Sequence, residues 1–219
     1  MLQPVNSLNY LYNYGTINYL MDTQQLYAEF WKWFLEKEDQ FFHYERQDSE
    51  LLDITLEKLK IIHPDLVFEI SPEYEGKREF IISANGLKEA FTSVIELANQ
   101  APEMDRWSII PFRQRKQDLD IEIEVEDMVL SPEDIFFTHE TSGNKISIDL
   151  YIAGIDIEDE RVFHIILLLL DNVVGEYDVE MKLDQIDIHP LTDVEDATKL
   201  YALKELPFIV DHHFNRKVD

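Results

Sequence analysis

The sequence contains no cysteine, and its 219 residues include only six glycines. The first absence excludes disulfides, thiolate metal sites and cysteine nucleophiles, and it leaves no reason to expect an oxidising compartment. The second leaves little material for a glycine-rich loop around a phosphate, and no phosphate-binding loop, dinucleotide fingerprint or nucleophile elbow is present. Familiar classes of kinase, dehydrogenase and serine hydrolase are therefore disfavoured, and we expect no cofactor.

Long apolar runs are also missing. The longest apolar stretch, residues 162–170, is interrupted by His164 and is far shorter than the ~20 residues that a membrane-spanning helix needs. The first residues carry neither the basic segment nor the small-residue cleavage site of a signal peptide. The sequence therefore predicts a cytoplasmic protein with no membrane partner.

Basic residues are scarce: 19 Lys and Arg stand against 45 Asp and Glu, which gives a net charge of −26. The imbalance is concentrated in residues 118–196, where 23 acidic residues face three basic ones, a local excess of 20 negative charges. Such a field repels nucleic acid and anionic membranes and attracts cations or basic proteins. Solubility alone is the simpler explanation. If the charge has a partner, we expect a basic protein.

Charge also divides the N-terminal region. Residues 1–20 contain no charged side chain, whereas charged and periodic sequence begins at Met21 and Asp22. We interpret residues 1–20 as an uncharged arm, either loosely held or not native, and residues 21–219 as a single α+β domain.

The domain begins with two predicted helices, one from Asp22 and one from about Asp48 to Pro64. Apolar residues in both recur every three to four positions. Four aromatic residues of the first helix could form a stacking platform for bases or sugars: Phe30, Trp31, Trp33 and Phe34. Their helical spacing and acidic neighbours favour packing in the core instead.

Two ββαβ units follow, at about 66–113 and 134–188. The first has strands at 66–70, 78–83 and 107–112 around a helix at 86–99. The second has strands at 135–138, 146–152 and 179–188 around a helix at 159–174 that Gly175 ends. We predict antiparallel sheets with helices on one face. The inward helical residues are expected to be Leu87, Phe91, Val94 and Ala98 in the first unit and Val162, Ile166, Leu169 and Val173 in the second.

A further strand is predicted over residues 119–125, and a helix ends the chain. The helix is expected to start at a capping box formed by Thr192 and Glu195, and to be interrupted by Pro207. The predicted fold class is therefore α+β, with two ββαβ units preceded by two helices and followed by a C-terminal helix.

The strand between the units carries acids at every second position, which we call the carboxylate ladder: Asp118, Asp120, Glu122, Glu124 and Glu126. Successive carboxylates on one face of a strand lie roughly 7 Å apart. Such a row suits the Lys and Arg side chains of a protein partner, and it lacks the glycine turn and clustered oxygens of a calcium loop. A solvated face that discourages edge pairing is the alternative.

Histidine is a common catalytic and metal-binding residue, but none of the seven histidines belongs to a recognised metal-binding sequence motif. The groups available for a metal-dependent hydrolase come from distant segments: His139, His189, Asp211 and His212. The string Gly175-Glu176-Tyr177-Asp178 brings two acids and a phenol into one turn. Catalysis by a carboxylate needs a second group at a fixed distance, so a structural turn is the preferred interpretation.

Three segments carry a resemblance to a known family: residues 30–34 (FWKWF), 170–179 (LDNVVGEYDV) and 206–208 (LPF). In these segments the chain resembles bacterial proteins of similar length to which no activity is assigned. The resemblance implies a fold and a bacterial cytoplasmic origin, and it transfers no catalytic residue. The residues themselves favour a non-enzymatic acidic interaction module that binds or neutralises a basic protein, with the metal-dependent hydrolase as the alternative.

Overall fold

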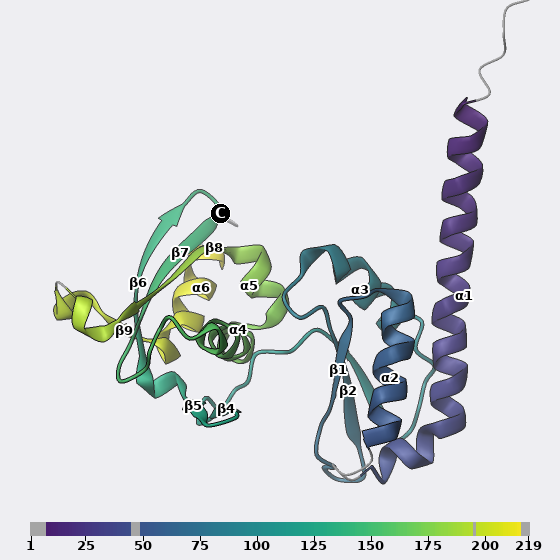
Figure 1. Ribbon diagram of the computed structural model, residues 1–219, viewed down its shortest axis with the longest axis horizontal. Helices are drawn as coiled ribbons and strands as arrows, with labels where there is room; N and C mark the ends of the chain where they lie inside the picture. The colour runs from purple at the N-terminus through teal and green to yellow at the C-terminus, as the bar shows by residue number, and fades with distance from the viewer. Residues whose placement is uncertain (1–7, 45–48, 195, 216–219) are drawn as a thin grey trace, which may run out of the picture. The chain divides into compact units, whose positions relative to one another are not determined.

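A computed structural model describes residues 8–44, 49–194 and 196–215 (Figure 1). The pattern of contacts divides the chain into two compact units. Unit 1 comprises residues 1–84 and 89–111, and unit 2 comprises residues 85–88 and 112–219. The sequence led us to expect a single domain over residues 21–219. The strands of the first ββαβ motif lie in unit 1 and those of the second lie in unit 2, while residues 85–88 of the first motif belong to unit 2.

In unit 1, two helices precede the first ββαβ motif along the chain. Its elements are α1 (Leu8–Phe42), α2 (Ser49–Ile62), β1 (Val67–Ile70), β2 (Arg78–Ser83), α3 (Phe91–Asn99) and β3 (Trp107–Pro111). Strands β1 and β2 pair antiparallel, whereas β2 and β3 pair parallel. The parallel pair follows from the connection, since α3 returns the chain to the edge where β2 began. The sheet is therefore mixed, although most strand pairs in the described chain are antiparallel.

Aromatic side chains of α1 form the core of unit 1, as their helical spacing predicts. The Phe34 ring lies 5.0 Å from that of Phe80 and 5.3 Å from that of Trp107, measured between ring centroids. The buried indole N–H of Trp31 donates to the Leu97 carbonyl at 2.8 Å. The helix itself begins at Leu8, so residues 8–20 of the expected arm are helical, and residues 1–7 lie outside the described part.

Unit 2 contains the second ββαβ motif with additions at both ends. Its elements are β4 (Ile123–Val125), β5 (Met128–Leu130), β6 (Ile135–Ser142), β7 (Lys145–Ile152), α4 (Glu160–Val174), α5 (Glu176–Lys182), β8 (Leu183–Pro190), β9 (Tyr201–Ala202) and α6 (Leu206–Asn215). The larger sheet has the order β8-β7-β6-β9, with β6 and β7 antiparallel and β7 and β8 parallel. The run β6-β7-β8 thus repeats the pairing of β1-β2-β3, which confirms the two predicted motifs.

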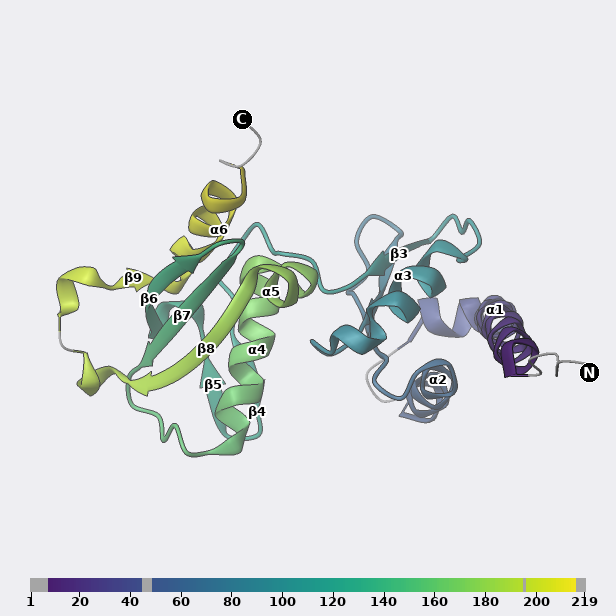
Figure 2. The same cartoon turned by 90° about the horizontal axis from the view of Figure 1, so that it is seen from above.

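Helices cover one face of this sheet, as Figure 2 shows for α4. Alternate residues of β7, beginning with Ile146, are buried, and the residues between them are half-buried. The four predicted inward residues of α4 are all fully buried: Val162, Ile166, Leu169 and Val173. Helix α6 contacts α4 and adds Leu206 and Val210 to the same core. The predicted C-terminal helix and the helices on one face are therefore confirmed here.

Three local predictions are wrong. Helix α3 begins only at Phe91, because a turn at Asn85 and Gly86, both with positive φ, and a 3-10 helix over Lys88–Ala90 occupy the predicted first turn. Leu87 therefore lies ahead of the helix, 44% exposed, and Leu97 is buried in place of Ala98. Residues 179–182 belong to α5 rather than to the closing strand.

The C-terminal helix also starts later than predicted. Thr192 lies in a short 3-10 turn, and Glu195, its expected capping partner, is outside the described residues. Helix α6 begins at Leu206, with Pro207 in its first turn. Proline fits there because the first turn of a helix has no internal acceptor for its N–H groups.

Candidate functional site

The carboxylate ladder is a row of exposed acids anchored by apolar neighbours. Only residues 123–125 form a strand, so the predicted strand over 119–125 is confirmed at its end alone. The alternation nevertheless holds along the segment: the apolar side chains between the acids are half-buried against the core of unit 2, namely Leu119, Ile121, Ile123 and Val125. Asp118, Asp120, Glu122 and Glu124 are exposed, and within the described chain no cation pairs with them.

Glu126 does not continue this row. It has a φ of 57° in the turn between β4 and β5, where the chain reverses. Its carboxylate accepts a hydrogen bond from Arg161 at 2.8 Å, and the same guanidinium contacts Asp127 at 2.7 Å and Asp159 at 2.6 Å. Hydrogen bonds from Arg161 lower the pKa of Asp159 to about 2 and lower that of Asp127. The four remaining members of the ladder have no such cation.

The four residues of the alternative hydrolase site do not converge. In β6, His139 shares the helix-covered face with the buried Phe137, two residues away. In β8, His189 pairs with Tyr151 on the opposite face, where its ring stacks on Tyr151 and its Nε2 lies 3.4 Å from Asp149. The sheet itself therefore separates the two histidines, because successive residues of a strand point to opposite faces.

Asp211 and His212, the two C-terminal residues of that site, have different partners. Asp211 binds Arg115 at 2.8 Å, whereas His212 lines a pocket together with His139 and with His213, which the sequence did not select. Among the residues that the structure describes, no three His, Asp or Glu side chains are placed to hold one metal ion. No observation therefore favours a metal-dependent hydrolase over the interaction module.

This pocket, which we call the histidine pocket, has a volume of about 480 Å³. It is lined by His139, Thr141, Tyr201, Glu205, Phe208, Ile209, His212 and His213. Among the described side chains, the buried polar atoms without a hydrogen-bond partner in the protein are His139 Nδ1 and His213 Nε2. Burial, followed by the charge of His213, lowers the pKa of His139. The neutral imidazole is therefore favoured there.

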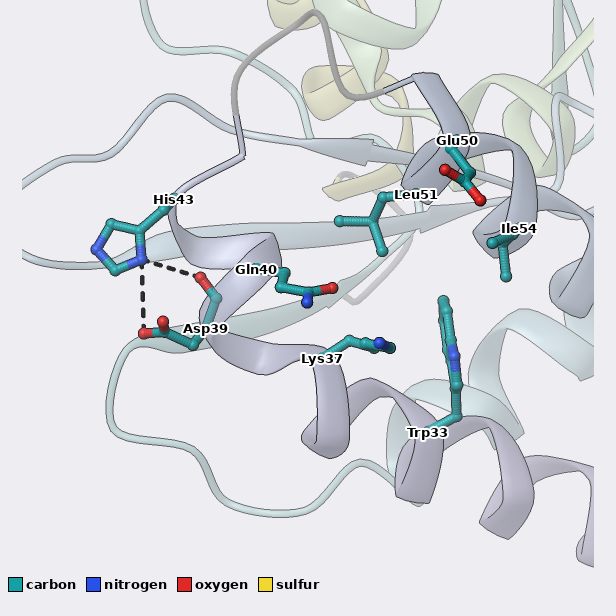
Figure 3. Close-up of a pocket in the computed structure, with 8 residues that line it drawn as sticks. All are labelled: Trp33, Lys37, Asp39, Gln40, His43, Glu50, Leu51 and Ile54. Carbon is teal, nitrogen blue, oxygen red and sulfur yellow. Dashed lines mark hydrogen bonds and ion pairs between the residues drawn. The ribbon is translucent and has the colours of Figure 1, made fainter.

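A larger pocket of about 640 Å³ lies in unit 1 along α1 and α2 (Figure 3). At one end the half-buried Trp33 faces Ile54, and the Lys58 ammonium lies 4.9 Å from the centroid of the indole. At the other end, Nδ1 of the exposed His43 lies 3.5 Å from the Asp39 carboxylate. Lys37, Gln40 and Glu50 also line this pocket, so it presents charged and amide groups beside the indole.

The turn at Gly175 has a structural role that sequence reasoning only partly identified. Gly175, with a φ of 102°, ends α4, and Glu176 begins α5 fully buried. The Glu176 carboxylate accepts hydrogen bonds from the backbone N–H of Arg113 at 3.0 Å and of Gly86 at 3.3 Å. The Arg113 guanidinium in turn binds the buried Asp171 at 3.1 Å. The Glu176 carboxylate therefore holds the backbone at Gly86 and at Arg113 against the start of α5.

None of the described helices is long and apolar enough to cross a membrane. Comparison with models of protein families, with curated proteins and with solved structures finds no match for the chain. The resemblance to bacterial proteins therefore stays a prediction, and functional inference depends on the geometry of the residues described above.

Proposed function

We propose that the protein is a non-enzymatic binding module that docks a basic protein through Asp118, Asp120, Glu122 and Glu124 and neutralises its positive surface. The observation that supports this proposal is the arrangement of these acids: they are exposed, lack cations of their own and recur at every second residue. Their apolar neighbours pack on the core of unit 2. A surface held in place in this way loses little conformational freedom on binding.

Repulsion among the carboxylates of this row favours the binding of cations. Two carboxylates at a separation of roughly 7 Å would repel by about 0.6 kcal/mol in water, so neighbouring acids oppose one another and incoming cations relieve that repulsion. A lysine-rich or arginine-rich segment both removes this repulsion and adds attraction. The effect operates within a Debye length, about 8 Å at physiological ionic strength, and weakens in salt.

The same charge argues against other partners. Nucleic acids and anionic membranes carry the sign of the ladder and are repelled by it. A divalent cation prefers oxygens that converge on one point, and among the described residues no three His, Asp or Glu side chains are placed to hold one. A basic protein is the partner whose charges can be spread along the row of acids.

The proposal is tested with two synthetic peptides of identical composition, one with lysine at every second position and one with its lysines in a block. The alternating peptide is expected to bind more tightly at 20 mM salt, and its affinity should fall steeply by 300 mM, as calorimetry would measure. Changing all four ladder acids to their amides, Asp118→Asn, Asp120→Asn, Glu122→Gln and Glu124→Gln, should remove most of this binding and keep the apolar anchors.

A matched control separates local recognition from total charge. It changes four exposed acids of unit 1 to amides and so alters the net charge equally: Glu36, Asp53, Glu57 and Glu89. The control is expected to retain most of the affinity. Equal losses in both variants, or equal affinity for the two peptides, would leave only a non-specific charge effect and would end the proposal.

A further inference from the structure

The larger sheet of unit 2 has a second face, opposite the one that its helices cover (Figure 2). Buried residues of α4, α5 and α6 share one core with alternate residues of β7, from Ile146 to Ile152. The residues between them point the other way, as successive residues of a strand do. On that side the side chains of Asp149 and His189 are 44% and 38% exposed. We call this side the open face, because solvent reaches its polar groups.

Strand register places two rows of side chains across the open face. The first row consists of rings: Phe136 on β6 is the partner of Tyr151 on β7, which is the partner of His189 on β8. All three are half-buried, and the last two stack with their centroids 5.3 Å apart. The second row is polar, and its members are Thr138, Asp149 and Asp187. The rows are in contact, because His189 Nε2 lies 3.4 Å from Asp149 Oδ1.

The polar row holds two acids side by side. Asp149 and Asp187 are partners in the register of β7 and β8, and neighbouring strands are only about 4.8 Å apart. Like charges directly opposite each other destabilise a sheet. Within the described chain neither acid pairs with a Lys or Arg. Asp149 accepts a hydrogen bond from the Thr138 hydroxyl at 3.3 Å. Asp187 accepts one from the Gln185 amide at 2.6 Å. The pair therefore favours a cation from outside the chain.

The neighbouring rings distinguish among cations. An ammonium is a compact, strongly hydrated charge, whereas a guanidinium is planar, stacks on aromatic rings and bonds to carboxylates through two N–H groups. A divalent metal is disfavoured, because no three His, Asp or Glu side chains of the described residues are placed to hold one. A neutral ligand would leave the charges of the two acids uncompensated. A guanidinium matches both rows.

The shape of the site and the charge of the chain indicate where the guanidinium comes from. Small molecules bind in concave sites, whereas a side chain that projects from a protein surface reaches a sheet face. A second copy of this chain carries the same net charge of −26 and is repelled. A different, basic protein has arginine side chains to offer and no such repulsion.

We propose that the open face docks an arginine side chain of a partner protein. The guanidinium stacks on the Tyr151 ring and donates hydrogen bonds to Asp149 and Asp187. The site shares no residue with the carboxylate ladder, so this inference does not rest on the proposed function, and either can fail alone.

The test compares three probes of nearly the same shape, the N-acetyl amides of arginine, lysine and citrulline, in which a neutral urea group replaces the guanidinium. Binding to the full chain at pH 8 and constant ionic strength is followed through the ring signals of isotope-labelled histidine in NMR spectra. The arginine probe is expected to shift the His189 signals until they saturate. The signals of His139 and His213, on the other side of the sheet, should stay unchanged.

The other two probes isolate charge and planarity. The lysine probe should bind about fivefold more weakly, because it lacks the planar stack and the paired N–H groups. The citrulline probe should not bind. Equal binding of arginine and citrulline, shifts spread over all histidines, or no saturable shift at tens of millimolar arginine probe would overturn the proposal.

A charge-matched pair of variants tests the acids. Asp149→Asn with Asp187→Asn should abolish saturable binding of the arginine probe. The control, Glu158→Gln with Glu160→Gln, removes two exposed acids just before and at the start of α4, which covers the other face. It should retain most of the affinity. Equal losses in the two double variants, both folded by circular dichroism, would refute the role of the acid pair.

A further variant tests the ring. Tyr151→Leu keeps both acids and removes the stacking surface, so the arginine and lysine probes should then bind about equally. An unchanged preference for arginine in the folded variant would refute the assigned stacking. A dimer in sedimentation that Tyr151→Leu dissociates would assign the open face to a second copy and would also overturn the proposal.

Discussion

Glu176 provides the sharpest test of how unit 2 is held together. Its carboxylate is fully buried and accepts hydrogen bonds from the backbone of Arg113 and Gly86 through different oxygens. Glu176→Gln preserves the shape but replaces one acceptor oxygen with a donor. One of the two backbone N–H groups then loses its partner, and a hydrogen bond to a charged group is worth about 1.5–3 kcal/mol. Glu176→Ala removes both acceptor oxygens, so we expect about twice that loss, roughly 3–6 kcal/mol.

The measurement is urea unfolding followed by circular dichroism, with Asp178→Asn as the matched control. Asp178 lies two residues away and pairs with Lys182 at 2.6 Å, with about a third of its side chain exposed. An exposed pair of this kind contributes about 0–1 kcal/mol. Amide hydrogen exchange at Arg113 should also accelerate in Glu176→Gln. Equal, small losses in Glu176→Gln and Asp178→Asn would show that the buried carboxylate does not fasten the loops, and the interpretation of this turn as structural would then lack support.

Two further predictions concern unit 2. Leu169→Ala should lower the free energy of unfolding in urea by about 2–5 kcal/mol, because it removes fully buried apolar contacts of α4. Glu158→Ala, at an exposed position, should change it by no more than about 0.5 kcal/mol. Equal losses would mean that α4 is not a core helix. Arg161→Gln should return the pKa of Asp159 from about 2 toward its ordinary 3.8, as carboxyl NMR titration would measure. The lowered pKa contributes stability above pH 3.8 that is lost as the pH falls toward 2, so the variant should lack this part of the acid transition, and an unchanged Asp159 titration would contradict the role of Arg161.

Periodicity predicted most of the fold because burial imposes it. Helix α4 must cover a sheet, so its apolar residues recur at helical spacing, and all four predicted inward residues are buried. The chain order ββαβ was predictable in both units for the same reason, since each element buries one face. The parallel pairing of the third strand was not predicted, although a crossover helix requires it.

Short segments were misassigned where contacts distant in sequence decide the structure. Val179, Met181 and Leu183 alternate like a strand, yet the first two lie in α5. The buried Glu176 fixes the start of that helix, and the pair between Asp178 and Lys182 lies along one turn of it. The partners of Glu176 are 63 and 90 residues away in the chain, so no local pattern indicates them.

The candidate sites show the same limit. The exposure of the ladder acids followed from alternation, but the departure of Glu126 depends on the turn that Arg161 stabilises from α4. His139 and His189 were grouped because both were available, and the faces of two strands separate them. His213 was not among the selected residues, and only the structure shows that its Nε2 is buried without a hydrogen-bond partner among the described residues.

Within the described chain, the acids at the end of the ladder pair with a cation, whereas the four before them do not. Arg161 contacts three carboxylates at once, so the chain uses a strong cation where the β4–β5 turn needs to be fixed. Glu126 and Asp127 are held at the turn by Arg161, and Val125 packs on the core next to the four acids that have no cation. Under the proposed function, a basic partner would meet acids whose backbone is already held by packed neighbours, which lowers the cost of ordering the segment on binding.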